Sequence, residues 1–157
     1  MSTRFLLALS LSAFACGGQP AAPDDTTTTR FIGRWTYQSG SAVFVDCPNA
    51  LQQTIDLSKV PPDNQPAYFT FTATAADRLH EVDARGCQYD WAVAGGVATA
   101  ATGQSCATFP DGRGGNRVVH LVSGTKTTTD GTSMRVDVQF TSDDGCAIHT
   151  QGQATKQ

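Results

Sequence analysis

From Phe31 onward the chain consists of short stretches in which apolar and polar residues alternate, separated by turn residues. The clearest stretch covers residues 134–140, where Met134, Val136, Val138 and Phe140 alternate with polar residues. A period of two places every second side chain on one face of a β-strand. No stretch shows a convincing apolar period of a helix, so the pattern predicts an all-β domain over residues 31–157.

The turns between these stretches are short, which favours antiparallel neighbours. Gly95-Gly96 is a two-residue hairpin signal. Pairing about it places the small residue Ala100 opposite Trp91, so that large and small side chains share one layer of the core. We expect roughly eight to ten antiparallel strands, arranged as an up-and-down barrel or a curved meander.

The predicted domain contains four cysteines at regular spacing: Cys47, Cys87, Cys106 and Cys146. Cys87 lies 40 residues after Cys47, and Cys146 lies 40 residues after Cys106. Both intervals end in glycine-cysteine before a strand, which favours two similar halves. The repeat favours Cys47–Cys87 with Cys106–Cys146, whereas the Gly95-Gly96 hairpin favours Cys87–Cys106 instead. Zinc is the alternative to two disulfides, but the C-x₂-C spacing is missing.

The first 15 residues have the features of an export signal. Arg4 precedes an apolar run at residues 5–14, which is too short to span roughly 30 Å of hydrocarbon as a helix. Ala13-Phe14-Ala15 is an A-x-A cleavage site, and together with Cys16 it is also a loose lipobox with Ala13 in the usual leucine position. Both readings predict a signal peptide at residues 1–15 and Cys16 at the mature N-terminus.

The signal resembles that of bacterial lipoproteins. An odd total of five cysteines supports this reading, because lipidation of Cys16 leaves four to pair. The resemblance implies a diacylglyceryl group and an N-acyl chain such as palmitate on Cys16, and Gly17 after it implies the outer membrane. Residues 16–30, rich in Gly, Pro, Asp and Thr, are then a disordered tether.

The opening of the domain, Phe31-x-Gly33-x-Trp35, resembles the G-x-W motif of lipocalins and the wider calycin group. In that family the tryptophan closes one barrel end, and an arginine of the last strand packs over it. Here the last strand offers His149 and Lys156. The whole layout also resembles small lipoproteins of delta-proteobacteria, which implies a class and a location but no chemistry.

The sequence contains no clear catalytic constellation. The histidines, His80, His120 and His149, lie in separate predicted strands. The glycine-rich segment at residues 111–115 lacks the Lys-Ser/Thr of a P-loop. The formal charge of −3 argues against a nucleic-acid partner. We therefore expect no catalytic residues, no metal site and no cofactor.

Two functions fit these expectations. The first is a structural or interaction module of the cell envelope, which would contact an envelope protein through loops at residues 60–66 and 108–116. The second is a lipocalin-like carrier of a small apolar ligand, for which a cavity above about 300 Å³ would be the sign. Candidate lining residues for such a ligand are the large apolar side chains on the predicted inner faces: Tyr37, Phe69, Phe71, Tyr89, Trp91, Met134 and Phe140.

Overall fold

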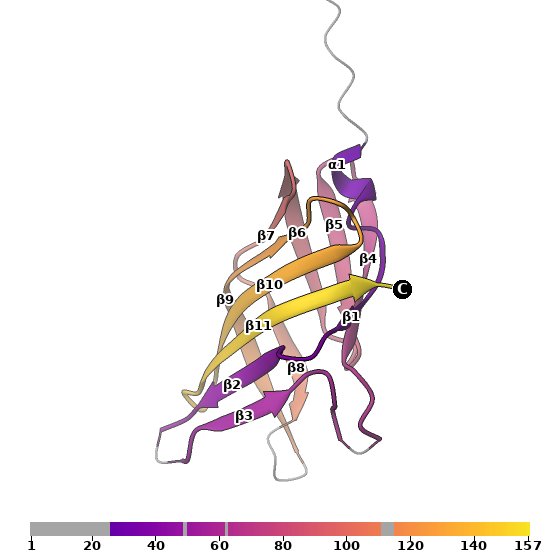
Figure 1. The fold of residues 1–157 in the computed structure, drawn as a ribbon. Helices are drawn as coiled ribbons and strands as arrows, with labels where there is room; N and C mark the ends of the chain where they lie inside the picture. Colours follow the sequence, from indigo (N-terminus) through magenta and orange to yellow (C-terminus); the bar gives the residue numbers. More distant parts are fainter. Residues whose placement is uncertain (1–25, 49, 62, 111–114) are drawn as a thin grey trace, which may run out of the picture.

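The computed structural model describes residues 26–157 except 49, 62 and 111–114. The described residues form one short helix and a series of strands joined mostly by tight turns (Figure 1). The elements are α1 (Thr26–Thr29), β1 (Gly33–Tyr37), β2 (Ala42–Asp46), β3 (Gln53–Asp56), β4 (Tyr68–Ala75), β5 (Arg78–Asp83), β6 (Gln88–Ala94), β7 (Val97–Ala100), β8 (Ser105–Pro110), β9 (Asn116–Thr127), β10 (Ser133–Ser142) and β11 (Ala147–Lys156).

Eight of the strands close into an antiparallel barrel. Their order around the barrel is β1, β4, β5, β6, β7, β9, β10 and β11. Strand β1 closes the ring because it pairs with β4 on one side and with β11 on the other. The predicted all-β fold is confirmed, and of the two predicted architectures the barrel is the one observed.

Two walls of the barrel are each built from two short strands placed end to end. Along β11, residues 154–156 pair with β1 and residues 147–151 pair with β2. At the break, the Ser41 hydroxyl donates to the carbonyl of Gln153 and accepts from its amide, at 2.9 and 3.0 Å. A Cβ on Gly152 would lie 2.3 Å from the Ser41 side chain, so this position requires glycine.

The second divided wall lies along β9. Its residues 125–127 pair with β7, and its residues 116–120 pair with β8. Between the two short strands, the Gln104 amide group accepts from the backbone N–H of Asp90 and donates to the carbonyls of Asp90 and Ala101. This side chain therefore supplies β6 with the hydrogen bonds that a continuous strand would have made.

Cys87 and Cys146, the second cysteine of each 40-residue interval, occupy equivalent hairpin turns. In the β5–β6 turn, the amide of Asp83 donates to the Cys87 carbonyl, and the Asp83 carboxylate accepts from the Cys87 amide. In the β10–β11 turn, the amide of Ser142 donates to the Cys146 carbonyl, and the Ser142 hydroxyl accepts from the Cys146 amide. The two hairpins thus share one hydrogen-bonding pattern, as the equal spacing indicates.

The disulfides, however, do not follow the repeat. The structure pairs Cys47 with Cys146 and Cys87 with Cys106. The pairing favoured by the repeat, Cys47–Cys87 with Cys106–Cys146, is wrong, and the hairpin alternative for Cys87 is confirmed. The reason is barrel closure: β2 pairs with β11 and not with β6, so the first cysteine of one half meets the second cysteine of the other.

The end of the barrel near α1 is closed by the residues of the G-x-W motif. Trp35 is fully buried, and its indole N–H donates to the carbonyl of Phe31 at 2.6 Å. The Nζ atom of Lys156 lies 5.4 Å from the centre of the Trp35 ring and donates to the Arg30 carbonyl. Lys156 therefore takes the place where the resemblance to lipocalins puts an arginine, since an ammonium group above an indole face is stabilised by the ring quadrupole.

The described part of the predicted tether is not extended. Residues 26–29 form the helix α1, and Thr28 is buried against the barrel. The predicted signal peptide, Cys16 and the rest of the tether lie outside the described residues. Within the described part of the chain, no helix has the length and apolar character needed to cross a membrane.

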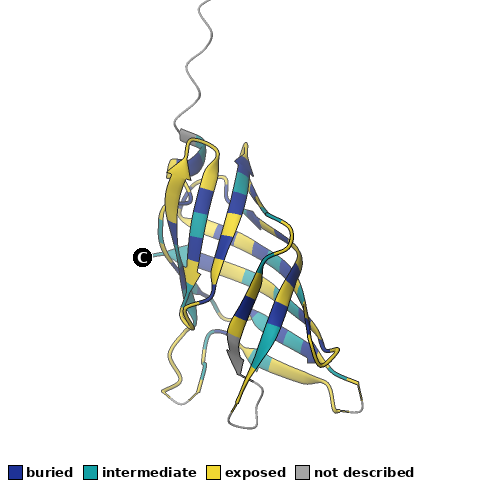
Figure 2. Ribbon diagram, turned by 180° about the vertical axis from the view of Figure 1, so that it is seen from behind, coloured by how far each residue is buried: buried dark blue, intermediate teal, exposed yellow. Residues whose placement is uncertain are grey.

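The barrel interior is filled by every second side chain of the strands. Buried and exposed residues alternate along them in Figure 2. Trp91 lies opposite Ala100, as the Gly95-Gly96 turn predicts. Gly124 adds further room for this large side chain, because a Cβ there would lie 3.1 Å from the indole. The core is therefore closely packed where the Trp91 indole meets Gly124 and Ala100.

Candidate functional site

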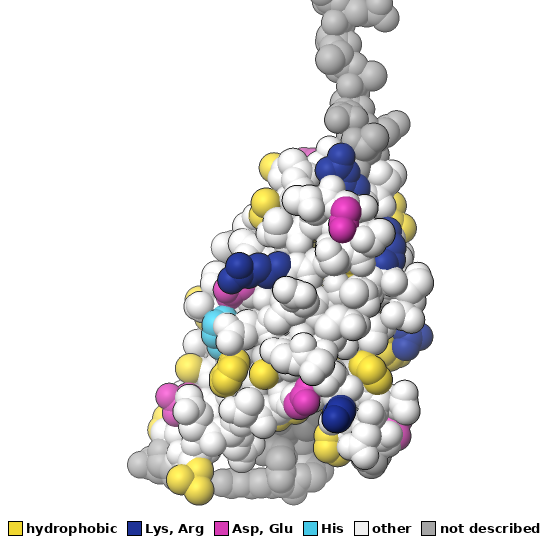
Figure 3. All heavy atoms as spheres, viewed as in Figure 1, with side chains coloured by type: hydrophobic (Ala, Val, Ile, Leu, Met, Phe, Trp, Pro, Cys, Tyr) yellow, Lys and Arg dark blue, Asp and Glu magenta, His cyan; other side chains and the backbone are white. Residues whose placement is uncertain are grey.

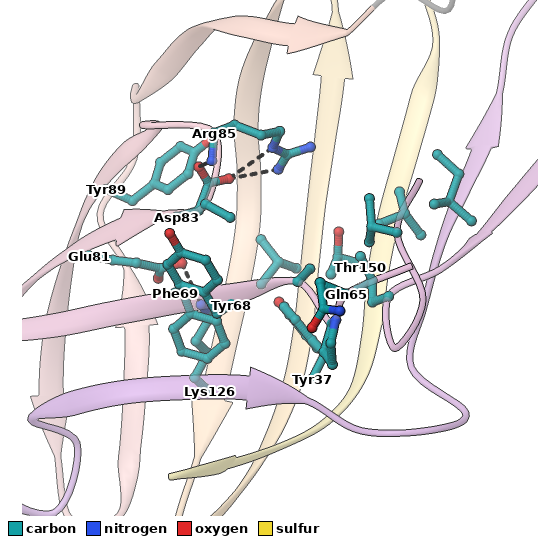
Figure 4. Close-up of a pocket in the computed structure, with 18 of the residues that line it drawn as sticks. Tyr37, Gln65, Tyr68, Phe69, Glu81, Asp83, Arg85, Tyr89, Lys126 and Thr150 are labelled. Carbon is teal, nitrogen blue, oxygen red and sulfur yellow. Dashed lines mark hydrogen bonds and ion pairs between the residues drawn. The ribbon is translucent and has the colours of Figure 1, made fainter. Parts of the chain in front are cut away.

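A cavity of about 450 Å³ occupies the end of the barrel opposite α1, and Figure 4 shows the residues that line it. Its mouth is formed by the loop that follows β3 and by the β5–β6 turn, where Asp83 and Arg85 form an ion pair of 2.7 Å. Leu57 and residues of β2 and β3 line one wall. The depth of the cavity reaches Trp91 and Lys126 near the middle of the barrel. The described residues of the loop at 60–66, which was expected to contact a partner protein, thus contribute to a cavity entrance.

Five of the seven predicted lining residues lie in this cavity: Tyr37, Phe69, Tyr89, Trp91 and Phe140. They form two aromatic contacts, Tyr37–Phe69 at 5.4 Å and Tyr89–Phe140 at 5.6 Å between ring centres. Burial raises the pKa of both tyrosines, so their phenols stay protonated.

The other two, Phe71 and Met134, do not line the cavity. Both are buried in the packed part of the core. There Phe71 packs edge-on against Trp91, with 6.1 Å between the ring centres. Their inward direction agrees with the alternation, but their height along the barrel places them outside the cavity. Whether any of the seven side chains touches a ligand stays a prediction.

A buried ion pair lies among the aromatic side chains of the cavity. Lys126 Nζ is 2.6 Å from Glu81 Oε1, and the two side chains are 2% and 6% exposed. The Nζ atom lies 3.4 Å from the centre of the Phe69 ring and 5.0 Å from that of Trp91. Both charged groups therefore lie in an environment of low dielectric, paired with each other and faced by aromatic rings.

Burial shifts both groups of this pair toward their neutral forms. The loss of solvent lowers the pKa of Lys126 and raises the pKa of Glu81, and in each case the partner's charge opposes the shift. Burial thus favours the neutral form of each group, and the charge of the partner favours the ionised pair. As a hydrogen-bond donor, the Trp91 indole also lowers the pKa of Glu81.

The sequence reasoning does not identify either member of this pair. The inward direction of Glu81 could have been predicted, because it lies two residues after Leu79 in the predicted strand and so points to the same face. Lys126 was harder to find, because a β-bulge reverses the alternation in β9 and Gly124 is its only local sign in the sequence. Gln139 pairs with Ser123 and Phe140 with Leu121, which leaves Val122 as the extra residue. Inward positions therefore change from odd to even numbers after the bulge, and Lys126 points inward.

The three histidines lie apart from the cavity and from one another. Each pairs with a different aspartate: His80 with Asp90 at 2.9 Å, His120 with Asp143 at 2.6 Å, and His149 with Asp137 at 2.9 Å. The four domain cysteines are all in disulfides. The three histidines of the described chain are therefore in three separate histidine–aspartate pairs and not in one shared site.

Comparison with known proteins finds similarity of fold only. No family model matches the chain, and no curated protein matches it. Among solved structures, it is similar to a redesigned β-barrel, mFAP1, bound to DFHBI, with a TM-score of 0.43 and 14% identity over 83% of this chain and 98% of that one. It is also similar to the vaccine antigen transferrin-binding protein B of Haemophilus parasuis, in a tryptophan-to-alanine mutant, with a TM-score of 0.39, 12% identity, and coverage of 83% of this chain and 29% of that one. Both are β-barrel likenesses at low identity.

Proposed function

We propose that the protein is an outer-membrane lipoprotein that binds one small, mostly apolar molecule inside its barrel. The observation that supports this most is the cavity of about 450 Å³, which falls within the roughly 300–1,000 Å³ of ordinary small-molecule sites. Aromatic and aliphatic side chains form its walls, and a few polar groups converge at its depth. This composition is typical of a carrier, the second of the two functions considered from the sequence.

The surface gives less support to the interaction module. On the face shown in Figure 3, apolar side chains are scattered among polar ones and do not gather into one patch. The most exposed large apolar residues of the described chain are Leu51, in the segment between β2 and β3, and Val122, in β9. An envelope protein is the alternative partner, but the cavity is the more specific feature.

We also propose that the protein has no catalytic activity of its own and no nucleic-acid partner. The separate histidine–aspartate pairs support the first point, because general acid–base catalysis needs such groups to converge on one substrate. The formal charge of −3 supports the second.

The position of the cavity fits an anchor at Cys16. The described chain begins at α1, and the cavity mouth lies at the other end of the barrel. A lipid on Cys16 would hold the α1 end toward the membrane and leave the mouth facing away from it. A ligand could then enter from the aqueous side without displacing the anchor.

Narrowing the mouth of the cavity should weaken the binding of a small apolar molecule. Val60 lines the entrance, and in the variant Val60→Trp we expect the Kd for the fluorescent apolar probe N-phenyl-1-naphthylamine to rise by about tenfold or more, which corresponds to ~1.4 kcal/mol. The measurement is a fluorescence titration of the purified protein at fixed probe concentration.

The matched control is Val122→Trp, which adds the same side chain at a 53% exposed position on the outside of the barrel. This control should bind the probe as the wild type does. Equal affinities for the wild type and both variants would show that the probe binds elsewhere, and absence of binding to the wild type would remove the main support for a carrier.

A further inference from the structure

The cavity contains the amine of Lys126, and a contribution to stability does not explain why it is there. Lys126 is 2% exposed and lines the cavity wall with Glu81. Lysine is almost never fully buried unless it is paired, as Lys126 is with Glu81. A buried ion pair is on average no more stabilising than apolar residues of the same volume, because desolvation offsets the attraction. A chemical role for the amine is therefore worth considering.

The surroundings of Lys126 are those of a reactive amine. Aromatic rings face the nitrogen, with the Phe71 ring centre at 5.2 Å in addition to Phe69 and Trp91. Desolvation lowers the pKa of Lys126, which makes its neutral, nucleophilic form more accessible. Glu81, at 2.6 Å, is in position to receive the proton that the ammonium group must lose.

We propose that Lys126 forms an imine with an apolar aldehyde held in the cavity, with Glu81 transferring the protons and then serving as the counter-ion. The inference rests on the proposed function, because the aldehyde must first be bound by the apolar walls. The ligand class is an aldehyde on an aryl or other apolar body, with its carbonyl directed toward the middle of the barrel.

The reaction is a condensation that needs no further reactant. The ammonium group of Lys126 gives one proton to Glu81, and the neutral amine attacks the carbonyl carbon to form a C–N bond. A second amine proton moves to the carbonyl oxygen, which gives a carbinolamine. Glu81 then returns its proton to the hydroxyl group, the C–O bond breaks, and water leaves. The product is a protonated imine beside the Glu81 carboxylate, where the aromatic faces stabilise its positive charge.

The test is to map where an aldehyde attaches. The wild-type protein is incubated with trans-cinnamaldehyde, reduced with sodium borohydride to fix any imine as a secondary amine, digested, and analysed by peptide mass spectrometry. The other two lysines are internal controls: Lys59 is exposed, and Lys156 lies over Trp35. We expect the adduct on Lys126 to form at least about tenfold faster than on either control, as a desolvated amine beside a proton-transfer partner should. An adduct rate on Lys59 equal to or above that on Lys126 would overturn the inference.

Two further measurements separate a chemical role from a packing role. The variant Glu81→Gln retains a side chain of similar shape but cannot accept the proton, so adduct formation on Lys126 should slow by about tenfold or more. An unchanged rate would exclude Glu81 from the reaction. Cinnamyl alcohol, which has no carbonyl group, should compete with N-phenyl-1-naphthylamine for the cavity. If the alcohol competes and the aldehyde leaves Lys126 unmodified, the imine inference fails while the carrier function stands. If neither compound competes, the carrier function fails as well.

Discussion

Replacing Lys126 with methionine should lower the free energy of unfolding by about 3–5 kcal/mol at pH 7, because a buried carboxylate is left without its partner. The side chain of Glu81 is 6% exposed and has only Lys126 as its ion-pair partner among the described residues. Methionine has nearly the length of lysine, so that little volume is lost. The measurement is urea unfolding followed by tryptophan fluorescence.

The pH dependence of this variant gives a second readout. Burial raises the folded-state pKa of Glu81 above its unfolded value, and removing Lys126 takes away the charge that opposes this shift. A raised carboxyl pKa costs stability only above the unfolded value, near pH ~4.3. The deficit of Lys126→Met relative to the wild type should therefore be largest near neutral pH and should shrink as the pH falls toward 4.

The control for this prediction removes both charges. In the double variant Glu81→Leu/Lys126→Met, an apolar pair of similar volume replaces the ion pair, and the stability should return to within about 1 kcal/mol of the wild type or exceed it. If the double variant is as unstable as Lys126→Met alone, the loss comes from packing, and the account of an unpaired buried charge is wrong.

The disulfide between Cys47 and Cys146 should stabilise the barrel more than the one between Cys87 and Cys106. The first closes a loop with a sequence separation of 99 residues, and the second closes one of 19. Chain entropy predicts a loss of about 4.7 kcal/mol for a loop near 100 residues and about 3 kcal/mol for one near 15 residues. The two double alanine variants, measured by urea unfolding under non-reducing conditions, should follow this order.

The same variants test the connectivity itself. In Cys47→Ala/Cys146→Ala, the remaining domain cysteines should still form one disulfide, and thiol titration of the unfolded domain should find neither of them free. Two free thiols from Cys87 and Cys106 would contradict the observed pairing. A greater loss for the short loop than for the long one would show that strain or packing, and not chain entropy, controls the contribution of these bridges.

The strand content and the local pairings were predictable from the sequence, but the disulfide partners were not. Alternation and turn residues determine which strands are neighbours in a hairpin, which is why Ala100 was expected opposite Trp91. The equal spacing of the cysteines shows which positions are equivalent in two halves. It does not show which of them meet, because that depends on β11 pairing with both β1 and β2 at the closure of the barrel.

The candidate site was predictable only in part, for a similar reason. Parity along a strand gives the direction of a side chain and not its height in the barrel, so Phe71 and Phe69 looked equivalent although only Phe69 lines the cavity. The position of Lys126 depends on the bulge at Val122, which is defined by pairing with β10; in the sequence, Gly124 inside the strand is its only local sign and does not give the register. The buried ion pair therefore became visible only in the assembled barrel.

The central claim, that the barrel carries a small molecule, is tested most directly by native mass spectrometry of the protein isolated from its own envelope. The account predicts one additional small mass per chain, retained under native conditions and released on unfolding, alongside the covalent mass of the lipid on Cys16. A native mass equal to that of the covalent protein alone, in every charge state, would contradict it.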